Sequence, residues 1–556
     1  MIYKPQQLEA MVLILISFSK TRNKIIQQKL TYMKYLKILI ALFLIPAIIF
    51  TSCSKRFEDY STNNNLPLQV PPSLILPTIL NDMVVYPGGD EDKNCQFIVS
   101  NYTYYGLNQY WSGSASLNYG TLRNVIAMET EARRLAGSDD NPYHALGLFF
   151  RAFFFTGMSE KVGDLPMNEA LQGLNNTTPK YDSQKDIFKQ SLLWLDSSNT
   201  MLNDFINNGF LEFSGDFFYQ SRLANQLSAR DALIEWQKVV NSYRLRVLIE
   251  LSKHTDDADL NIKQQFSSII SNPSKYPIFT SNDDNLQYVY NSAYNYYPDN
   301  PGNYGNNAGR LNIAATLLNN LSTLHDIRAM VIAEPARGLG FSDTSYKSFV
   351  GGASGEDVST LATLSGAGKL SLYNYNHFYS TYTAEPTLIL SFPEVCFCIA
   401  EAINRGWVTG DAELWYKTGT EAMFSFYGIK DGDNVVTFQQ NGGGNLNYTV
   451  HFSFDDYFNQ PAVKYKGNNI DGLNQILLEK YLAYARNSGL QAYYQWRRTG
   501  VPAFDAGSGS GNGGIIPKRF QYPTNELTAN ANNLQAALQA QYSGNDDINA
   551  LMWLIK

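Results

Sequence analysis

Apolar residues recur at spacings of three and four along several long stretches of the chain, which is the pattern of amphipathic helices. In Asn141–Lys161, this spacing places Leu146, Phe150 and Phe153 on one side of a helix. Ser183 precedes another such stretch and suits the N-cap position. Further helices are predicted at about Ser183–Leu202, Ala229–Ser252, Arg310–Leu324, Thr387–Arg405, Asp411–Tyr427, Asn474–Arg486, Gly489–Arg497 and Asn530–Tyr542.

The order of these stretches predicts the fold class. The helices follow one another along the chain, strand signals are weak and local, and the consensus TPR signature is missing. We therefore predict a mostly α fold of TPR-like stacked helical hairpins with long irregular loops. The segments Asp283–Gly309 and Phe341–Phe378 are too long to be simple connectors, and long ordered loops commonly carry function.

The N-terminal segment has the pattern of a targeting signal. An apolar run, Ile38–Phe50, follows the positive Lys34 and Lys37 and is interrupted by Pro46. This run is too short for a membrane span of about 20 residues. We interpret residues 1–52 as a signal segment in which residues 1–32 are an upstream extension before the natural start at Met33. An uncleaved anchor is the alternative interpretation.

The residues after the apolar run suggest a lipid anchor. Phe50-Thr51-Ser52-Cys53 resembles a bacterial lipobox, and the resemblance implies lipidation of Cys53. The following residues are polar, rich in Asn and interrupted by Pro, which is typical of a flexible linker. We expect residues 53–72 to be a lipidated tether and residues 73–556 to form the folded domain.

Composition narrows the class of ligand. The 556 residues include only 17% charged residues, and the net charge of −7 argues against a protein that binds nucleic acid through phosphates. Aromatic residues make up 13% of the chain, and Asn is abundant. A surface rich in Tyr and Asn suits neutral polar ligands.

Catalytic and metal-binding patterns are weak. Glu394 and Glu401 lie seven residues apart, which places them about 10 Å apart on one helix face, whereas a glycosidase pair flanks its substrate from different elements. Cys396 and Cys398 point to different sides of one helix and suit a core. We expect the acidic run Asp90–Asp92 to be solvated. The sequence therefore predicts no enzyme, no metal site and no cofactor.

The candidate ligand-binding residues lie in three segments rich in aromatic residues. Sugars present apolar C–H faces and a rim of hydroxyl groups, so exposed rings beside Asn and Gln side chains match both surfaces. The alternative is that these rings fill the core beneath the loops. The predicted ligand-binding residues are Tyr104, Asn108, Gln109, Tyr110, Trp111, Tyr294, Tyr296, Tyr297 and Tyr375.

Several fragments in a shared order carry a resemblance to a known family. They include Val162-Gly163-Asp164-Leu165-Pro166, the helix Trp236–Arg246 that ends in Arg-Leu-Arg, and Arg497-Arg498-Thr499-Gly500. Phe150–Ala152, Thr177–Gln184, Asp326–Arg328, Phe392–Trp407 and Ile516–Pro523 extend the match over nearly all of the predicted domain. Together they resemble the SusD/RagB-like nutrient-binding outer-membrane lipoproteins, in particular their second subgroup.

The resemblance implies a monomeric helical domain on the bacterial surface that covers a SusC-type TonB-dependent transporter and delivers oligosaccharides or peptides to it. It attributes no catalysis to the fold, and its ligand sites differ between members. We therefore expect a lipid-anchored outer-membrane protein that binds oligosaccharides. Peptide binding, a glycan-active enzyme and a purely architectural role remain the alternatives.

Overall fold

The computed structural model describes residues 69–556, apart from 106–107, 109–113, 221–225 and 441–442, together with 22, 24, 27–34 and 36. The chain divides into two units, Met1–Val70 and Pro71–Lys556. All the elements below belong to the second unit. Cys53 lies outside the described residues, so its lipidation stays a prediction.

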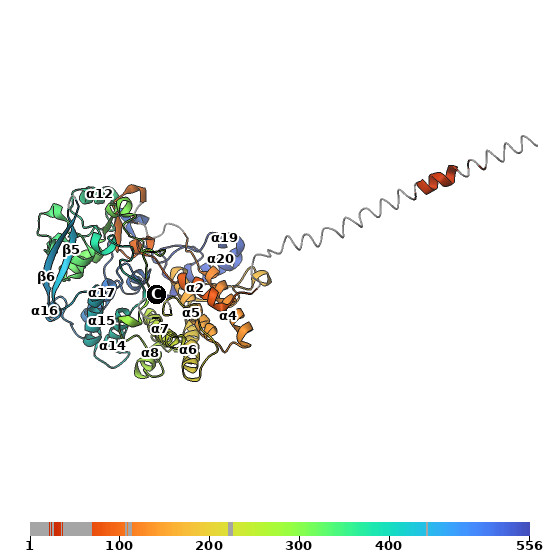
Figure 1. Cartoon of the computed structure of the whole chain (residues 1–556), viewed down its shortest axis with the longest axis horizontal. Coiled ribbons are helices and arrows are strands. Elements are labelled where there is room, and N and C mark those ends of the chain that lie inside the picture. Colours follow the sequence, from red (N-terminus) through yellow and green to blue (C-terminus); the bar gives the residue numbers. More distant parts are fainter. Residues whose placement is uncertain are drawn as a thin grey trace, which may run out of the picture. The chain divides into compact units, whose positions relative to one another are not determined.

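Consecutive helices stack along one flank of this unit (Figure 1). After α2 (Pro72–Asn81), they are α4 (Tyr119–Ala136), α5 (Pro142–Val162), α6 (Gln184–Asn208), α7 (Ala229–Glu250) and α8 (Ile262–Ser271). From α4 to α8 each helix packs against the next along the chain. The side chains of Asn141, Ser183 and Ser228 cap α5, α6 and α7. The predicted mostly α, TPR-like hairpin fold is confirmed.

A second group of helices packs against α7. It consists of α14 (Phe392–Asn404), α15 (Ala412–Phe426), α17 (Ile470–Ala483) and α18 (Gln491–Thr499), and α14 contacts α7, α15 and α17. The side chains of Ser391, Asp411 and Asn469 cap the first three of these helices. We call α4–α8 together with this second group the helical framework.

The described residues form three two-stranded antiparallel sheets, which lie outside the helical framework. They pair β1 (Ile98–Ser100) with β3 (Leu311–Ile313), β2 (Leu286–Tyr288) with β4 (Thr387–Leu390), and β5 (Gly432–Gln439) with β6 (Asn445–Phe452). The helices predicted at Arg310–Leu324 and Thr387–Arg405 were therefore wrong at their starts. All four residues of β4 are buried, and a short buried strand is as continuously apolar as a buried helical turn.

The remaining helices are short, except α20. They are α3 (Asp90–Asn94), α9 (Tyr304–Asn307), α10 (Ala315–Thr323), α11 (Arg328–Ile332), α12 (Val358–Gly366), α13 (Tyr375–Phe378), α16 (Phe454–Asn459), α19 (Glu526–Ala529) and α20 (Ala531–Tyr542). Among the described residues, no helix is both long enough and apolar enough to cross a membrane.

Buried ion pairs join the elements of the helical framework. On α18, Arg498 donates to Glu401 of α14 at 2.5 and 3.0 Å, and on α7 Arg246 donates to Glu394 of α14 at 2.5 Å. All four side chains are at most 5% exposed. The guanidinium of Arg498, near the end of α18, reaches across the core. Gly500 does end α18 in the left-handed conformation, with φ 78°.

Candidate ligand-binding site

A hollow of about 600 Å³ opens beside the loop that follows β2. We call it the aromatic hollow. The described residues that line it carry rings, amides, hydroxyls and aliphatic groups, and none of these residues is charged. They are Phe217, Phe218, Gln287, Tyr288, Val289, Asn291, Ser292, Ala293, Tyr294 and Asn295.

The loop owes its shape to one asparagine. Asn291 Oδ1 accepts from the backbone N–H groups of Ala293 and Tyr294 at 3.0 Å and of Asn295 at 3.3 Å. Asn291 N donates to Asn295 O at 2.7 Å, which closes the turn. Asn favours such turns because its side chain mimics a backbone acceptor. The turn leaves the side chain of Tyr294 87% exposed at the hollow.

Edge-to-face ring contacts build the wall of the aromatic hollow. The ring of Tyr288 lies 5.7 Å from that of Phe217 and 5.4 Å from that of Tyr290. Tyr288 Oη also donates to Asn295 Oδ1 at 3.3 Å. A ring held on several sides loses little further freedom when a ligand packs against it, so the wall is preorganised.

Tyr296 is the next exposed ring of the same loop. It is 46% exposed and packs at 4.6 Å against Tyr382, but it does not line the aromatic hollow. Phe217 and Asn291 do line it, although neither belongs to the predicted set. The position of Asn291 inside a Tyr-rich segment could have indicated its turn, whereas nothing in the sequence places Phe217 beside that segment.

Two predicted ligand-binding residues are buried instead. Tyr297 is 0% exposed, and its ring packs between Tyr290 and Phe378, at 5.1 and 6.2 Å. Burial raises the pKa of Tyr297 well above its ordinary value. Asn108 is 1% exposed, and its Oδ1 accepts from Ser100 N at 2.8 Å. Neither side chain offers a surface to a ligand, so we remove both from the candidate site.

The other predicted residues do not join the aromatic hollow. Tyr104 is 81% exposed, and its ring lies 6.2 Å from that of Tyr102. Tyr375 is half-buried, and its ring packs at 4.7 Å against Tyr304. Gln109, Tyr110 and Trp111 lie outside the described residues. Among the predicted residues that the structure describes, only Tyr294 lines this hollow.

Three carboxylates considered in the sequence for catalysis or metal binding are paired with arginines in the structure. Burial opposes ionisation of Glu401, but Arg498 and Arg405 outweigh it and lower the pKa to about 2. The side chain of Glu394 is 1% exposed and bound to Arg246. Asp92, expected to be solvated, is 5% exposed, and its carboxylate lies 3.5 Å from Arg486 Nε. Within the described part of the chain, no group of three or more His, Cys, Asp or Glu could hold a metal ion.

Comparison with known proteins agrees with this architecture. A family model described as "Starch-binding associating with outer membrane" matches residues 92–523. Two SusD homologues of known structure from Bacteroides fragilis are 26% and 27% identical to the chain, with TM-scores of 0.75 and 0.71. Each match covers 88% of this chain and 100% of the homologue. A Bacteroides vulgatus outer-membrane protein is 25% identical, with the same coverage and a TM-score of 0.72. No curated protein matches.

Proposed function

Because the chain belongs to the SusD-like family of outer-membrane nutrient-binding proteins, we propose that it binds an oligosaccharide at the aromatic hollow and delivers it to a SusC-type TonB-dependent transporter. The proposal includes a position on the cell surface, with attachment through lipid on Cys53. It assigns the chain no catalytic step.

The observation that carries this proposal is the exposed ring of Tyr294 at an uncharged hollow. A sugar ring can pack its C–H face on the aromatic face, as bases stack on aromatic platforms. Asn291, Asn295 and Gln287 supply amide groups around the ring. The volume of about 600 Å³ lies within the usual range of small-molecule sites, which is roughly 300–1,000 Å³.

The same lining favours a glycan over a peptide. A peptide brings charged termini and side chains, and a groove that selects it gains from charged partners. None of the described residues that line the aromatic hollow is charged. A binding screen of the purified chain against malto-, xylo- and chito-oligosaccharides and against a mixed peptide library tests this choice. We expect binding within the glycan panel, and binding to peptides alone would contradict the proposal.

The glycans of this binding screen also test whether the chain lacks catalytic activity. Chromatography of each glycan after prolonged incubation with the chain should return the glycan unchanged. Shortened products that form in proportion to the amount of chain would show an enzyme instead.

The transporter and the anchor need separate tests. Affinity purification of the tagged chain from native outer membranes should recover a TonB-dependent transporter. Cys53→Ser removes the lipidated thiol, so we expect the variant to leave the membrane fraction. Recovery without any transporter, or an unchanged membrane fraction for Cys53→Ser, would contradict the corresponding part of the proposal.

A further inference from the structure

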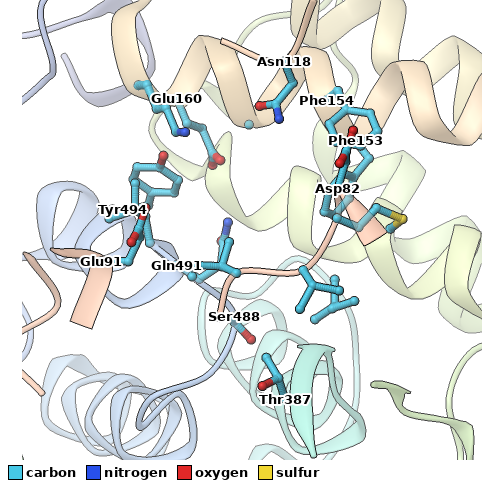
Figure 2. A pocket seen from close by; sticks show the side chains of 18 of the residues that line it. Asp82, Glu91, Asn118, Phe153, Phe154, Glu160, Thr387, Ser488, Gln491 and Tyr494 are labelled. Carbon is cyan, nitrogen blue, oxygen red and sulfur yellow. The ribbon is translucent and has the colours of Figure 1, made fainter. Parts of the chain in front are cut away.

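A second cavity, of about 420 Å³, lies between α5, the segment after α2, β4 and the start of α18 (Figure 2). We call it the polar pocket. Phe153 and Phe154 of α5 form part of its wall. At its margin, Val85 and Tyr86 are 38% and 41% exposed. Its volume is that of a small-molecule site.

Polar groups from three separate elements face this space. Figure 2 shows the Glu160 carboxyl, the Asn118 amide and the Gln491 amide directed toward the same region. Gln491 Oε1 is buried and has no hydrogen-bond partner among the described residues. Asn118 occupies the N-cap position of α4, yet its side chain makes no capping hydrogen bond. A buried acceptor without a partner is costly, and a bound hydroxyl would satisfy it.

Glu160 is suited to a neutral ligand. Glu160 is 4% exposed. Burial, and to a smaller extent the negative charge of the nearby Glu250, raises the pKa of its carboxyl to about 8. The carboxyl is therefore protonated at neutral pH and can both donate and accept a hydrogen bond. Four other charged residues line the pocket, namely Asp82, Glu91, Lys161 and Arg246. Arg246 is bound to Glu394, Asp82 accepts from Thr121 at 2.6 Å, and Lys161 Nζ donates to Ser116 O at 3.4 Å.

The polar pocket adjoins the aromatic hollow. Thr387 lines the pocket, and its partner across the β2–β4 pair is Tyr288, which lines the hollow. Tyr86, at the pocket margin, also packs edge-on against Tyr288 with ring centroids 5.7 Å apart. The two cavities are therefore separated by one pair of residues in a sheet and by one ring contact. An extended ligand could reach from one to the other.

Gly157 of α5 borders open space in the polar pocket. Gly157 lies within α5 and lines the pocket, and a Cβ built on it would meet nothing within 4 Å. Glycine inside a helix costs about 1 kcal/mol relative to alanine, so this position gives up helix stability while it leaves space beside Phe153 and Phe154.

From these observations, we propose that the polar pocket is a second subsite that holds one end of the glycan whose other units pack at the aromatic hollow. This inference rests on the proposed function. The hydroxyl groups of a terminal sugar would bind Glu160, Asn118 and Gln491, while its apolar face would contact the rings of α5. The ligand class is thus a glycan long enough to occupy both cavities.

The test compares affinity with glycan length. Isothermal titration uses the malto-, xylo- and chito-oligosaccharides of the screen, each from the disaccharide upward, with the full chain and with Gly157→Leu. Leucine at this position would project into the space beside Phe153 and Phe154 and narrow the pocket. For the series that binds, we expect the wild-type affinity to rise about tenfold at the glycan length that first reaches the pocket. A tenfold rise is what one or two additional buried hydrogen bonds contribute to binding. Gly157→Leu should lose that rise and keep the affinity for shorter glycans.

Controls separate a blocked pocket from a damaged fold. Gly157→Ala adds only a methyl group where there is space, so it should bind like the wild type. Thermal unfolding of Gly157→Leu should occur at or above the wild-type temperature, because leucine favours helix more than glycine does. Gln491→Ala removes the unpaired acceptor without filling the pocket and should also reduce the rise with length.

The outcomes distinguish the two proposals. If the wild-type chain binds no glycan, the proposed function fails and the subsite fails with it. If the wild type, Gly157→Leu and Gln491→Ala bind every length equally, the aromatic hollow can still be the binding site, but the polar pocket is not a subsite.

Discussion

The helical framework and the loop after β2 use polar and aromatic groups in opposite ways. In the framework, Arg498 and Glu401 are buried and hold α18 against α14. In the loop, Tyr294 and Tyr296 face solvent, although Tyr290 and Tyr297 in the same segment are buried. The first arrangement supports the fold, and the second offers a surface. Substitutions in the framework should therefore change stability, and substitutions of the exposed rings should change binding.

The loop also shows why residue type alone does not assign a role. Four tyrosines within eight residues, Tyr290–Tyr297, divide evenly between core and surface. The turn held by Asn291 separates the buried Tyr290 from the exposed Tyr294, whereas Tyr297 is buried because the rings of Tyr290 and Phe378 pack against it. In a regular helix the burial of each position follows from its spacing, whereas in this loop it depends on the turn and on which distant residues pack against each ring.

The largest expected effect is loss of a framework ion pair. Arg498→Met removes the cation that contacts Glu401 and leaves this buried carboxylate with Arg405 alone, whose side chain is 26% exposed. Breaking a buried pair from one side typically costs about 3–5 kcal/mol of unfolding free energy. Chemical denaturation should show this loss, while the folded fraction should keep the wild-type glycan affinity.

A double variant provides the control. Arg498→Met combined with Glu401→Gln removes both charges, so it should recover part of the lost stability. A loss of glycan affinity in correctly folded Arg498→Met would contradict the division between framework and loop.

The next effect is a pH dependence from Glu160. Its pKa of about 8 in the folded chain exceeds the ordinary value of 4.5, so on raising the pH the unfolded chain loses this proton first. The contribution of Glu160 to stability is therefore lost progressively from about pH 4.5 to 8. Near pH 8, the free energy of unfolding of Glu160→Gln, measured by chemical denaturation, should exceed that of the wild type by on the order of a few kcal/mol, with little difference near pH 4.5. A constant difference across this range would contradict the raised pKa.

A smaller effect separates a buried ring from an exposed ring. The hydroxyl of Tyr297 is buried and has no hydrogen-bond partner among the described residues. Tyr297→Phe removes that unsatisfied group, so we expect about 1 kcal/mol of added stability and unchanged glycan affinity. Tyr294→Phe is the matched control at an exposed ring and should leave the unfolding temperature unchanged. Weakened binding by Tyr297→Phe would place this residue back in the site.

The sequence predicted most helices of the framework, although not α4 or α8, because helix signals are local. The spacing of apolar residues can be seen within each helical segment. The capping residues Ser183 and Asp411 directly precede their helices, and the structure places both at N-caps. The helices predicted to begin at Arg310 and Thr387 begin later in the structure, because these starts belong to β3 and β4 or their flanks. These strands pair with distant segments, β3 with Ile98–Ser100 and β4 with Leu286–Tyr288. No local pattern records such pairing.

The candidate site was less predictable for the same reason. Tyr294 was found because it lies in an obvious Tyr-rich segment. Phe217 comes from a distant part of the chain, and Tyr297 differs from Tyr294 only in what the fold places over it. The polar pocket gathers Glu160, Asn118 and Gln491 from three helices or their ends, which no sequence spacing indicates.

The central claim is that exposed rings of an anchored helical scaffold hold a neutral glycan, and Tyr294→Ala tests it most directly. The variant is titrated with the glycan that the wild type binds most tightly. Its affinity should be at least about tenfold lower, because one stacked aromatic ring contributes this much to binding, and its unfolding temperature should be unchanged. Wild-type affinity in a fully folded Tyr294→Ala chain would contradict the account.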